Sequence, residues 1–203
     1  MKLRVTGVIL AGGMSTRLGR NKALEPLAGQ PLIGRVIALL STLTDESVVV
    51  VNDEHRAAEL PLPKDSLVAV DVYPDSGSLG GIFTGLQAAN GEWALVVACD
   101  MPFLNPSLLS RMLELSDGYE VVVPILDGRP EPTHALYSKV CIPHLEERIQ
   151  QGKLKITGFY ENVRVRYIME DEVDRLDPGR LSFFNINTED DLDRAKSLVA
   201  AGH

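Results

Sequence analysis

The stretch VTGVILAGGMSTRLGRNK, residues 5–22, decides how the rest of the chain is interpreted. An apolar run over residues 5–10 precedes two adjacent glycines, small polar residues and the cations Arg17 and Lys22. Such a stretch can be a secretory signal, a phosphate-binding loop or an ordinary surface turn. The apolar run is short and interrupted, and no cleavage site of small residues follows it, which argues against a signal peptide. We therefore expect a β-strand that ends at the glycines.

Length and composition are typical of a soluble globular protein. The chain has 203 residues, of which 45% are hydrophobic and 24% charged, and we expect one domain spanning residues 1–203. The formal net charge of -8 argues against a general attraction to nucleic acid or to anionic lipid. No apolar stretch approaches the roughly 20 residues of a membrane span. Cys99 and Cys141 have no CxxC spacing, which favours a reducing cytoplasm and disfavours a zinc site.

Short β-branched runs alternate with helical patterns along the first two thirds of the chain. The expected strands are residues 5–10, 47–52, 67–72, 93–100 and 120–126, and the expected helices cover residues 31–43, about 53 onward, 80–89 and 106–115. Near-continuous apolar strands are typical of a parallel sheet that is covered by helices on both faces. The predicted fold class is α/β, a three-layer α/β/α sandwich with a mostly parallel sheet.

The pattern changes after Asp127, without a linker, a repeat or a low-complexity segment. We expect a strand over residues 133–138, a helix over 140–150 and a strand-like stretch over 164–169. A last helix begins near Thr188, because the sequence TEDD is typical of a helix N-cap and first turn. These elements are assigned to the same domain.

Gly12 and Gly13 stand where the first strand ends, and ligands of open α/β sheets bind beyond the carboxyl ends of strands. Glycine lets backbone N–H groups approach a ligand closely, and successive N–H groups form a concave anion site. Ser15 adds a hydroxyl, and Arg17 and Lys22 add positive charge. The spacing matches neither GxxxxGK[ST] nor GxGxxG, which disfavours an NAD oxidoreductase. Together these residues suit a triphosphate.

The loop reads L-A-G-G-x-S-x-R-x-G-x-x-K, at Leu10, Ala11, Gly12, Gly13, Ser15, Arg17, Gly19 and Lys22. Four later segments also follow a recognisable pattern: DVYPDSGSLGGIFTGL (71–86), ACDMPFL (98–104), RPEPTHALYS (129–138) and FFNINTEDDL (183–192). Together they resemble the motifs of the MobA family, the molybdenum cofactor guanylyltransferases. The resemblance covers nearly the whole chain and implies a Rossmann-like fold of the nucleotide-diphospho-sugar transferase type. The chain departs from the family's motifs at Ser78 and Glu189, where proline is usual, and at Thr133, where leucine is usual.

The resemblance implies that GTP and molybdopterin, or its molybdenum-bearing form, give molybdopterin guanine dinucleotide and pyrophosphate. It also implies a nucleotide-binding half, about residues 1–105, and an acceptor-binding half, about residues 106–203. The expected catalytic residues are Lys22, Arg17 and Asp100. The expected nucleotide-binding residues are Leu10, Ala11, Gly12, Gly13, Ser15, Lys22, Asp71, Gly77 and Asp100. A phosphate acceptor with a second pKa near 6 needs no general base, so the transfer requires positioning and charge neutralisation.

Asp100 ends an apolar strand, which places its carboxylate at the same sheet edge as the glycine loop. Mg²⁺ binds one or two carboxylates together with substrate phosphates, so Asp100 is the expected ligand of a Mg²⁺ cofactor. The alternative is that Asp100 only caps the next helix. Asp71 also follows a strand, and it is either a nucleotide contact, as the resemblance implies, or a solvated strand-end acid.

The acceptor site is less well defined by the sequence. Asn185 and Asn187 precede the last helix, where Asn is common as a cap. The resemblance implies instead that both line the active site and reach the metal or the pterin phosphate, and the two interpretations stay open. His134 is either an acceptor contact or a buried core residue. Arg164 and Arg166 share one face of a strand-like stretch and are best explained as a solvated face.

Gly12 gives the sequence LAGG, whereas related cytidylyltransferases that act on the same pterin carry LAAG, so the resemblance favours guanine. The enzymatic alternatives are such a cytidylyltransferase and a guanylyltransferase for adenosylcobinamide phosphate. The non-enzymatic alternative is a catalytically silent GTP-binding module. The expected partners are GTP and molybdopterin, and a GTP-binding accessory protein and molybdoenzyme maturation partners are further candidates. No nucleic-acid or membrane partner is expected.

Overall fold

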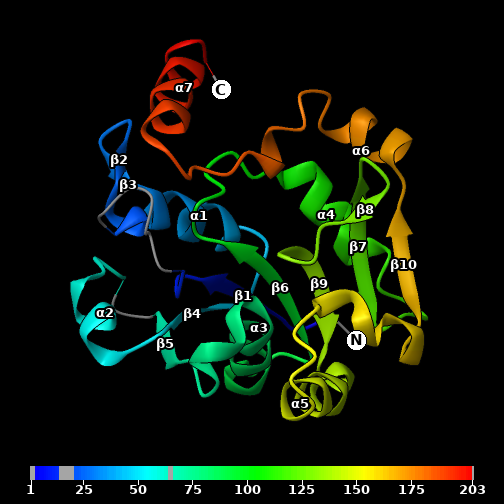
Figure 1. Cartoon of the computed structure of the whole chain (residues 1–203). Coiled ribbons are helices and arrows are strands. Elements are labelled where there is room, and N and C mark those ends of the chain that lie inside the picture. The colour runs from blue at the N-terminus through cyan, green and yellow to red at the C-terminus, as the bar shows by residue number, and fades with distance from the viewer. Residues whose placement is uncertain (1–2, 14–20, 64–65, 203) are drawn as a thin grey trace.

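The computed structural model describes residues 3–13, 21–63 and 66–202. One sheet with the strand order β10-β7-β9-β6-β1-β4-β5 forms the centre, and β8 pairs with β7 (Figure 1). The strands of this sheet and of the small hairpin β2-β3 are β1 (Val5–Leu10), β2 (Pro26–Leu27), β3 (Gln30–Pro31), β4 (Glu46–Val51), β5 (Leu67–Val70), β6 (Trp93–Ala98), β7 (Val121–Leu126), β8 (Arg129–Pro130), β9 (His134–Ser138) and β10 (Val165–Ile168).

β1 lies between β4 and β6 and runs parallel to both. β5 extends the sheet in parallel beyond β4, and β10 is parallel to β7. β9 runs antiparallel to both β6 and β7. The sheet is therefore mostly parallel, as the sequence predicts, with an antiparallel insertion that the sequence pattern did not reveal.

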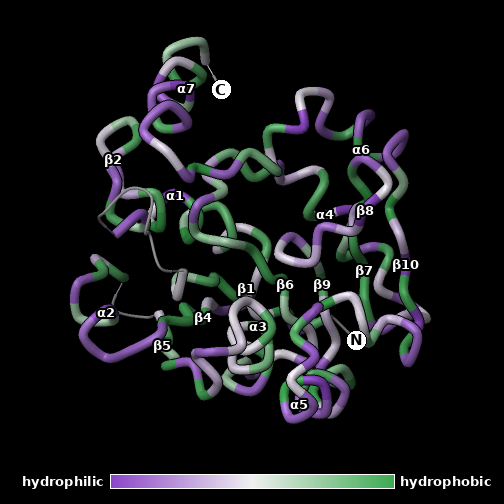
Figure 2. The backbone as a smooth tube through the Cα atoms, viewed as in Figure 1, coloured by the Kyte–Doolittle hydropathy of each residue, from purple (hydrophilic) through white to green (hydrophobic). Residues whose placement is uncertain are grey.

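Helices cover both faces of the sheet, which confirms the predicted three-layer sandwich. They are α1 (Leu32–Leu40), α2 (Glu54–Glu59), α3 (Gly77–Ala88), α4 (Pro106–Glu114), α5 (Ile142–Gln150), α6 (Glu170–Leu176) and α7 (Glu189–Ala200). One buried cluster joins the sheet to α1, α4 and α6, and a second joins the opposite face to α3 and α5. Figure 2 shows hydrophobic colour along the central strands and more hydrophilic colour on the outer helices. None of the helices in the described ranges has the length and apolar character of a membrane span.

The side chains of β1 show why this strand is central. Val5 and Ile9 belong to the core on the α1 side, and Val8 belongs to the core on the α3 side. Successive residues of a strand point to opposite faces, so an apolar run of this kind has to be covered on both faces. The first strand of the sequence therefore becomes the middle of the sheet.

α3 packs very closely on β1 and β4 because glycines face the sheet. A Cβ at Gly85 would overlap the side chain of Val8, and a Cβ at Gly81 would lie 3.1 Å from Leu10 Cδ2. The helix begins at Gly77, whose φ of 57° is a conformation that favours glycine. The sequence prediction began this helix at Gly80, because the glycine-rich first turn has no strong helical pattern.

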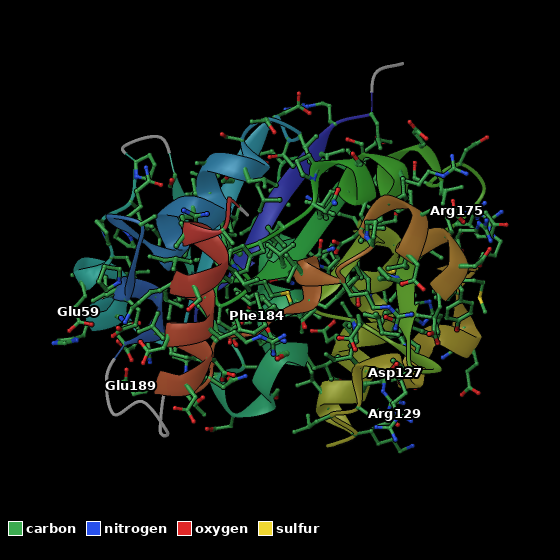
Figure 3. All side chains as sticks on the ribbon, turned by 90° about the horizontal axis from the view of Figure 1, so that it is seen from above. Glu59, Asp127, Arg129, Arg175, Phe184 and Glu189 are labelled. Atoms are coloured by element: carbon green, nitrogen blue, oxygen red, sulfur yellow. The ribbon has the colours of Figure 1, made fainter. Side chains whose placement is uncertain are left out.

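α7 lies outside the three layers and covers the β2-β3 hairpin. Its N-cap, Thr188, forms a capping box with Asp191. A small core joins the helix to the hairpin through Leu27, Leu32, Ile186, Leu192 and Ala195. The Arg194 guanidinium stacks over Phe184, and Figure 3 shows this ring beside α7. The last helix therefore holds the segment before it in place.

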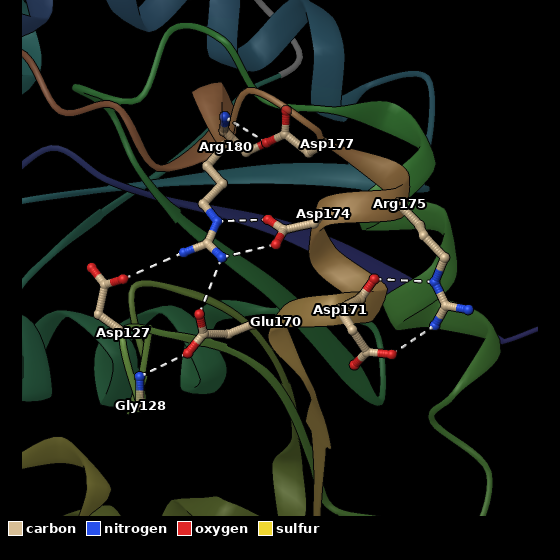
Figure 4. Close-up of polar contacts among 9 residues, drawn as sticks. Asp127, Gly128, Glu170, Asp171, Asp174, Arg175, Asp177 and Arg180 are labelled. Carbon is tan, nitrogen blue, oxygen red and sulfur yellow. Dashed lines mark hydrogen bonds and ion pairs between the residues drawn. The ribbon is translucent and has the colours of Figure 1, made fainter.

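An ion-pair network fixes α6 and the β7-β8 turn in the C-terminal half (Figure 4). Arg180 donates to Asp174 and to Glu170, and its Nη1 lies 3.4 Å from Asp127 Oδ1. Glu170 also accepts a hydrogen bond from the backbone of Gly128. Asp127 and Gly128 both have positive φ, as a two-residue Asp-Gly hairpin turn requires. The sequence analysis predicted neither α6 nor this hairpin.

Gly85→Ala tests the close approach of α3 to β1. We expect the free energy of unfolding to fall by about 1–3 kcal/mol, because an added methyl at a tightly packed position forces the backbone to shift. Urea denaturation followed by circular dichroism measures this change.

Gly34→Ala in α1 is the matched control, since its Cβ would meet only Pro31 Cδ at 3.9 Å. This substitution is expected to be neutral or to stabilise the helix by up to about 1 kcal/mol. Equal effects of the two substitutions would contradict the packing described here.

Candidate active site

The carboxyl ends of β1, β4, β5 and β6 meet at one edge of the sheet. Backbone hydrogen bonds continue beyond the strands there: Ala11 N donates to Val50 O at 2.8 Å, and Cys99 N donates to Leu10 O at 3.1 Å. The strand order also reverses at β1: β4 and β5 lie on one side of it, and β6, the next strand along the chain, lies on the other. Ligands of open α/β sheets bind at such a switch point.

Lys22 joins three segments that lie far apart in the sequence. It opens a short 3₁₀ turn whose cap, Asn21, accepts a hydrogen bond from Ala23 N at 3.2 Å. The Lys22 Nζ lies 2.7 Å from Asp100 Oδ2 and 2.9 Å from Asn187 Oδ1. The Lys22 and Asp100 side chains are only 15% and 14% exposed. The cation and the carboxylate predicted from separate motifs are therefore in direct contact.

The second carboxylate oxygen of Asp100 fits a metal ligand. Oδ1 is buried and has no hydrogen-bond partner in the described part of the chain. A buried acceptor without a donor is costly, whereas a hard oxygen of this kind suits a divalent cation. Within the described ranges no group of three or more His, Cys, Asp or Glu side chains could hold a metal. Mg²⁺ in proteins commonly binds one or two carboxylates and takes its other ligands from substrate phosphates and water.

A cavity of about 230 Å³ opens between the ends of β1 and β4 and the start of α3. Its lining residues are Leu10, Gly12, Gly13, Val50, Asn52, Asp71, Pro74, Gly77, Ser78 and Gly81. Five of the expected nucleotide-binding residues are in this set: Leu10, Gly12, Gly13, Asp71 and Gly77. A mostly apolar lining with a few fixed polar groups is typical of small-molecule sites.

Asp71 is a buried wall of this cavity, with 7% exposure. Its Oδ1 accepts hydrogen bonds from Thr84 Oγ1 at 2.8 Å and from Tyr73 N at 3.0 Å. The alternative of a solvated strand-end acid is therefore wrong. α3 supplies Thr84, so the helix that packs on the sheet also orients this carboxylate.

Asn52 is a site residue that the sequence analysis missed. It follows β4 directly and lines the same cavity as Asp71. A Cβ at Gly12 would overlap the Asn52 amide oxygen. The absence of a side chain at Gly12 is thus what leaves room for Asn52. Its position in the sequence could have indicated a site residue, because Asn52 follows an apolar strand as Asp71 and Asp100 do.

A second cavity, of about 140 Å³, lies beside the first. It is lined by Leu10, Ala11, Gly13, Asn21, Lys22, Ala23, Arg56, Ser78, Ala98, Cys99, Asp100 and Thr133. Leu10, Gly13 and Ser78 line both cavities, so the two are adjacent. The sequence analysis did not single out Asn21 or Arg56, whose side chains are joined by a hydrogen bond from Arg56 Nη2 to Asn21 Oδ1 at 3.3 Å.

A third, more open cavity of about 530 Å³ lies toward the C-terminal half. It is lined by Asp75, Ser76, Gly77, Ser78, Leu79, Pro132, Leu154, Lys155, Ile156 and Thr157. Ser78 lines all three cavities. Pro132 lines the third and Thr133 the second, so the segment that leads into β9 lies between them.

The other residues predicted for nucleotide binding and catalysis fall into two groups. Ser15, Arg17 and Gly19 lie outside the described residues. Ala11, Lys22 and Asp100 line the second cavity.

The residues predicted for the acceptor do not line the three cavities described above, although Asn187 contacts Lys22, which lines the second. His134 is fully buried, its ring centre lies 4.7 Å from that of Phe183, and neither ring nitrogen has a partner among the described residues. Burial lowers the pKa of His134 to about 3, so the ring is neutral near pH 7. Asn185 donates to the Phe183 carbonyl at 3.3 Å, whereas Asn187 contacts Lys22. Arg164 forms a surface ion pair with a glutamate.

The parallel strand ends, the adjacent cavities and the lysine–aspartate pair are typical of a nucleotidyltransferase of the α/β type. Residues 7–164 match the family model described as the MobA-like NTP transferase domain. The chain belongs to this family.

Named relatives cover almost the whole chain. The molybdenum cofactor guanylyltransferase of Desulfosudis oleivorans is 38% identical over 98% of this chain and 97% of its own length. The crystal structure of molybdopterin-guanine dinucleotide biosynthesis protein A from Archaeoglobus fulgidus has a TM-score of 0.83 at 32% identity, covering 97% of this chain and 99% of that one. The 2-C-methyl-D-erythritol 4-phosphate cytidylyltransferase of Thermus thermophilus, at 18% identity, has a TM-score of 0.72 over 98% of this chain and 100% of its own, and shares the fold.

The reactivity of the two cysteines tests their burial: Cys99 lines the second cavity, and Cys141 lies in the core that contacts α5. Burial, together with the neighbouring Asp100 carboxylate, raises the pKa of the Cys99 thiol to about 12, and burial raises the pKa of Cys141 to about 12 as well. At pH 8 only roughly one thiol in ten thousand is then the reactive thiolate. We expect iodoacetamide to leave both residues unmodified in the folded protein and to alkylate both in urea, as measured by mass spectrometry. Rapid alkylation of the folded protein would contradict this.

Proposed function

We propose that this chain is a molybdenum cofactor guanylyltransferase, which transfers GMP from GTP to molybdopterin or its molybdenum-bearing form and releases pyrophosphate. The observation that carries the proposal is the contact of Lys22 Nζ with both Asp100 and Asn187 beside the glycine loop. The family and the activity named for its full-length relatives support it.

The proposal places the nucleotide across the two adjacent cavities. The 230 Å³ cavity takes the guanine and ribose, with the Asp71 carboxylate and the Asn52 amide as hydrogen-bonding groups. The triphosphate passes Gly13 into the 140 Å³ cavity, where it meets Lys22. Successive backbone N–H groups at the glycine loop and a nearby ammonium group are a common arrangement for phosphate binding.

The reaction is an in-line displacement at the α-phosphorus. An oxygen of the acceptor's terminal phosphate forms the new bond, the bond from the α-phosphorus to the bridging oxygen breaks, and its electron pair leaves with pyrophosphate. Because the second pKa of a phosphate monoester is near 6, the attacking oxygen is largely deprotonated at neutral pH and no general base is required. Lys22 positions the phosphates and neutralises their charge in the transition state.

We propose Mg²⁺ as the cofactor and Asp100 as its protein ligand. When bound, a divalent cation would neutralise charge on the triphosphate and on the leaving pyrophosphate. The Asp100 Oδ1 is the oxygen available for it, because Lys22 holds Oδ2.

We place the acceptor in the C-terminal half, about residues 106–203 of a single domain, and the nucleotide in the half formed by about residues 1–105. Asn187 is the acceptor contact that the proposal relies on, because its amide oxygen touches Lys22. Asn185 lies two residues earlier, and His134 is buried beneath the segment that carries both. A cytoplasmic location is part of the proposal, and the two free cysteines are consistent with a reducing compartment. An accessory GTP-binding protein and molybdoenzyme maturation partners complete the proposal.

The decisive experiment supplies each of the four NTPs with molybdopterin and measures pyrophosphate release. We expect release with GTP only. Release with CTP would favour the cytidylyltransferase alternative, and release only with adenosylcobinamide phosphate as acceptor would replace the assigned acceptor. GTP binding without release from any acceptor would favour the catalytically silent module.

Asp100→Asn keeps the shape of the side chain and removes its charge. We expect pyrophosphate release to fall about a hundredfold or more, because a group that neutralises developing charge is lost, while GTP binding largely persists. Asp193→Asn is the control, since Asp193 is an exposed acid that pairs with Lys196 on α7. Unchanged release by the Asp100 variant would remove this residue from the mechanism.

Gly12→Ala tests the placement of the base. The added methyl would displace the Asn52 side chain, whose end can rotate, so we expect an unchanged melting temperature but a loss of GTP affinity of about tenfold. Calorimetric titration measures the affinity, with Gly34→Ala as control. Wild-type affinity in the Gly12 variant would place the nucleotide elsewhere.

A further inference from the structure

Arg56 is a cation of the 140 Å³ cavity that the reaction described above does not use. We propose that its guanidinium binds the β- and γ-phosphates of the nucleotide and stabilises the leaving pyrophosphate. This inference rests on the proposed function, because it assumes that the triphosphate lies in this cavity.

The chain fixes Arg56 at the cavity through local structure. β4 ends at Val51, Asn52 follows as a wall of the neighbouring cavity, and α2 begins two residues later. The Asp53 side chain caps α2 by accepting a hydrogen bond from the backbone N–H of Arg56 at 2.8 Å. Leu60, directly after the helix, is buried in the core and anchors its far end. The position of Arg56 is therefore set by the same strand that places Asn52.

Asn21 links Arg56 to Lys22. The Asn21 Oδ1 accepts hydrogen bonds from Arg56 Nη2 at 3.3 Å and from Ala23 N at 3.2 Å, and the second bond caps the turn that Lys22 opens. The Asn21 amide nitrogen also lies 3.4 Å from Glu59 Oε2 on α2. One asparagine thus holds two cations from separate segments beside the same cavity.

The guanidinium has an unmet hydrogen-bonding group. Its Nε is buried and has no partner among the described residues. A buried N–H without an acceptor is unfavourable, and a phosphate oxygen that entered the cavity would supply one. Guanidinium groups bind phosphate with two parallel N–H donors, which an ammonium group cannot do.

The charges around the cavity also favour an anion. Lys22 and Arg56 both line the 140 Å³ cavity, although they come from separate segments of the chain. Among the described residues, the lining carries these two cations and one carboxylate, Asp100, so it has a net positive charge for a polyphosphate.

The in-line geometry of the reaction places Arg56 on the side of the leaving pyrophosphate. The nucleophile and the leaving group lie on opposite sides of the phosphorus in an in-line displacement. Asp100 and Thr133 belong to the part of the cavity next to the C-terminal half, from which the acceptor comes. Arg56 belongs to α2 and lines the part of the cavity where Asn21 lies. As the α-phosphorus to oxygen bond breaks, its electron pair moves onto the pyrophosphate, where the guanidinium neutralises it.

The test compares nucleotides of different phosphate number in the Arg56→Gln and Arg56→Lys variants of the whole chain. Arg175→Gln is the matched control, because Arg175 is an exposed arginine that pairs with Asp171 within α6. Figure 3 shows Arg175 on the opposite side of the molecule from Glu59, a residue of α2. Calorimetric titration in Mg²⁺ measures the affinity for GTP, GDP and GMP, and melting temperature reports folding.

We expect Arg56→Gln to weaken GTP binding about ten- to a hundredfold and to leave GMP binding unchanged, since lost charge-assisted hydrogen bonds are worth about one to two powers of ten. Arg56→Lys should recover part of the GTP affinity, and the control should match wild type. A purely structural role would weaken GMP and GTP equally or lower the melting temperature of both variants, and either result overturns the proposal. An unchanged GTP affinity together with a raised KM for molybdopterin, measured by pyrophosphate release, also overturns the proposal, because Arg56 would then bind the acceptor.

The inference can be separated from the proposed function. If wild-type protein binds GTP more tightly than GMP through Arg56 but releases no pyrophosphate with molybdopterin, the acceptor assignment fails and the phosphate assignment stands. If GTP and GMP bind equally to wild-type protein, the phosphate assignment itself fails.

Discussion

The parallel pairing of β1 with β4 on one side and β6 on the other is the constraint on which the structure depends. Because all three strands run the same way, their carboxyl ends meet at one edge, and the residues that follow them become neighbours. Gly12, Asn52 and Asp100 are brought together in this manner, although they are separated by tens of residues in the sequence. The apolar side chains on both faces of β1 secure the pairing, so the core determines where the polar groups of the site lie.

A positive and a negative side chain are paired at this edge of the sheet. Lys22 and Asp100 neutralise each other across 2.7 Å, and both side chains are mostly buried. Breaking such a pair by removing one partner leaves an uncompensated charge, so each group stabilises the other's position. In the proposed reaction, a phosphate chain would be a further anionic partner for Lys22, and a divalent cation would be a cationic partner for Asp100. The pair would then hold in place, within the folded protein, the two charges that phosphoryl transfer uses.

The fold and the central part of the site could be predicted from the sequence because their signals are local. The apolar strands give the layers, and the glycine loop with the strand-end aspartates gives Gly12, Lys22, Asp71 and Asp100. Other features depend on tertiary contacts. The antiparallel course of β9 and the Arg180 network are not encoded by any short pattern. In the sequence, Arg56 is one charged residue of a polar helix. Whether its side chain reaches the cavity depends on how α2 packs after β4.

Glycine has a structural role at this site that goes beyond a flexible loop. The methyl that Gly12 lacks would occupy the space of the Asn52 amide, and the one that Gly85 lacks would occupy the space of a β1 side chain. Both positions determine how closely two other groups approach: a loop and a strand end in the first case, a helix and the sheet in the second. The size of the 230 Å³ cavity follows from both, because α3 forms one wall and the strand ends form the other. The lack of a side chain at these two positions therefore sets the shape of the cavity in which we place the base.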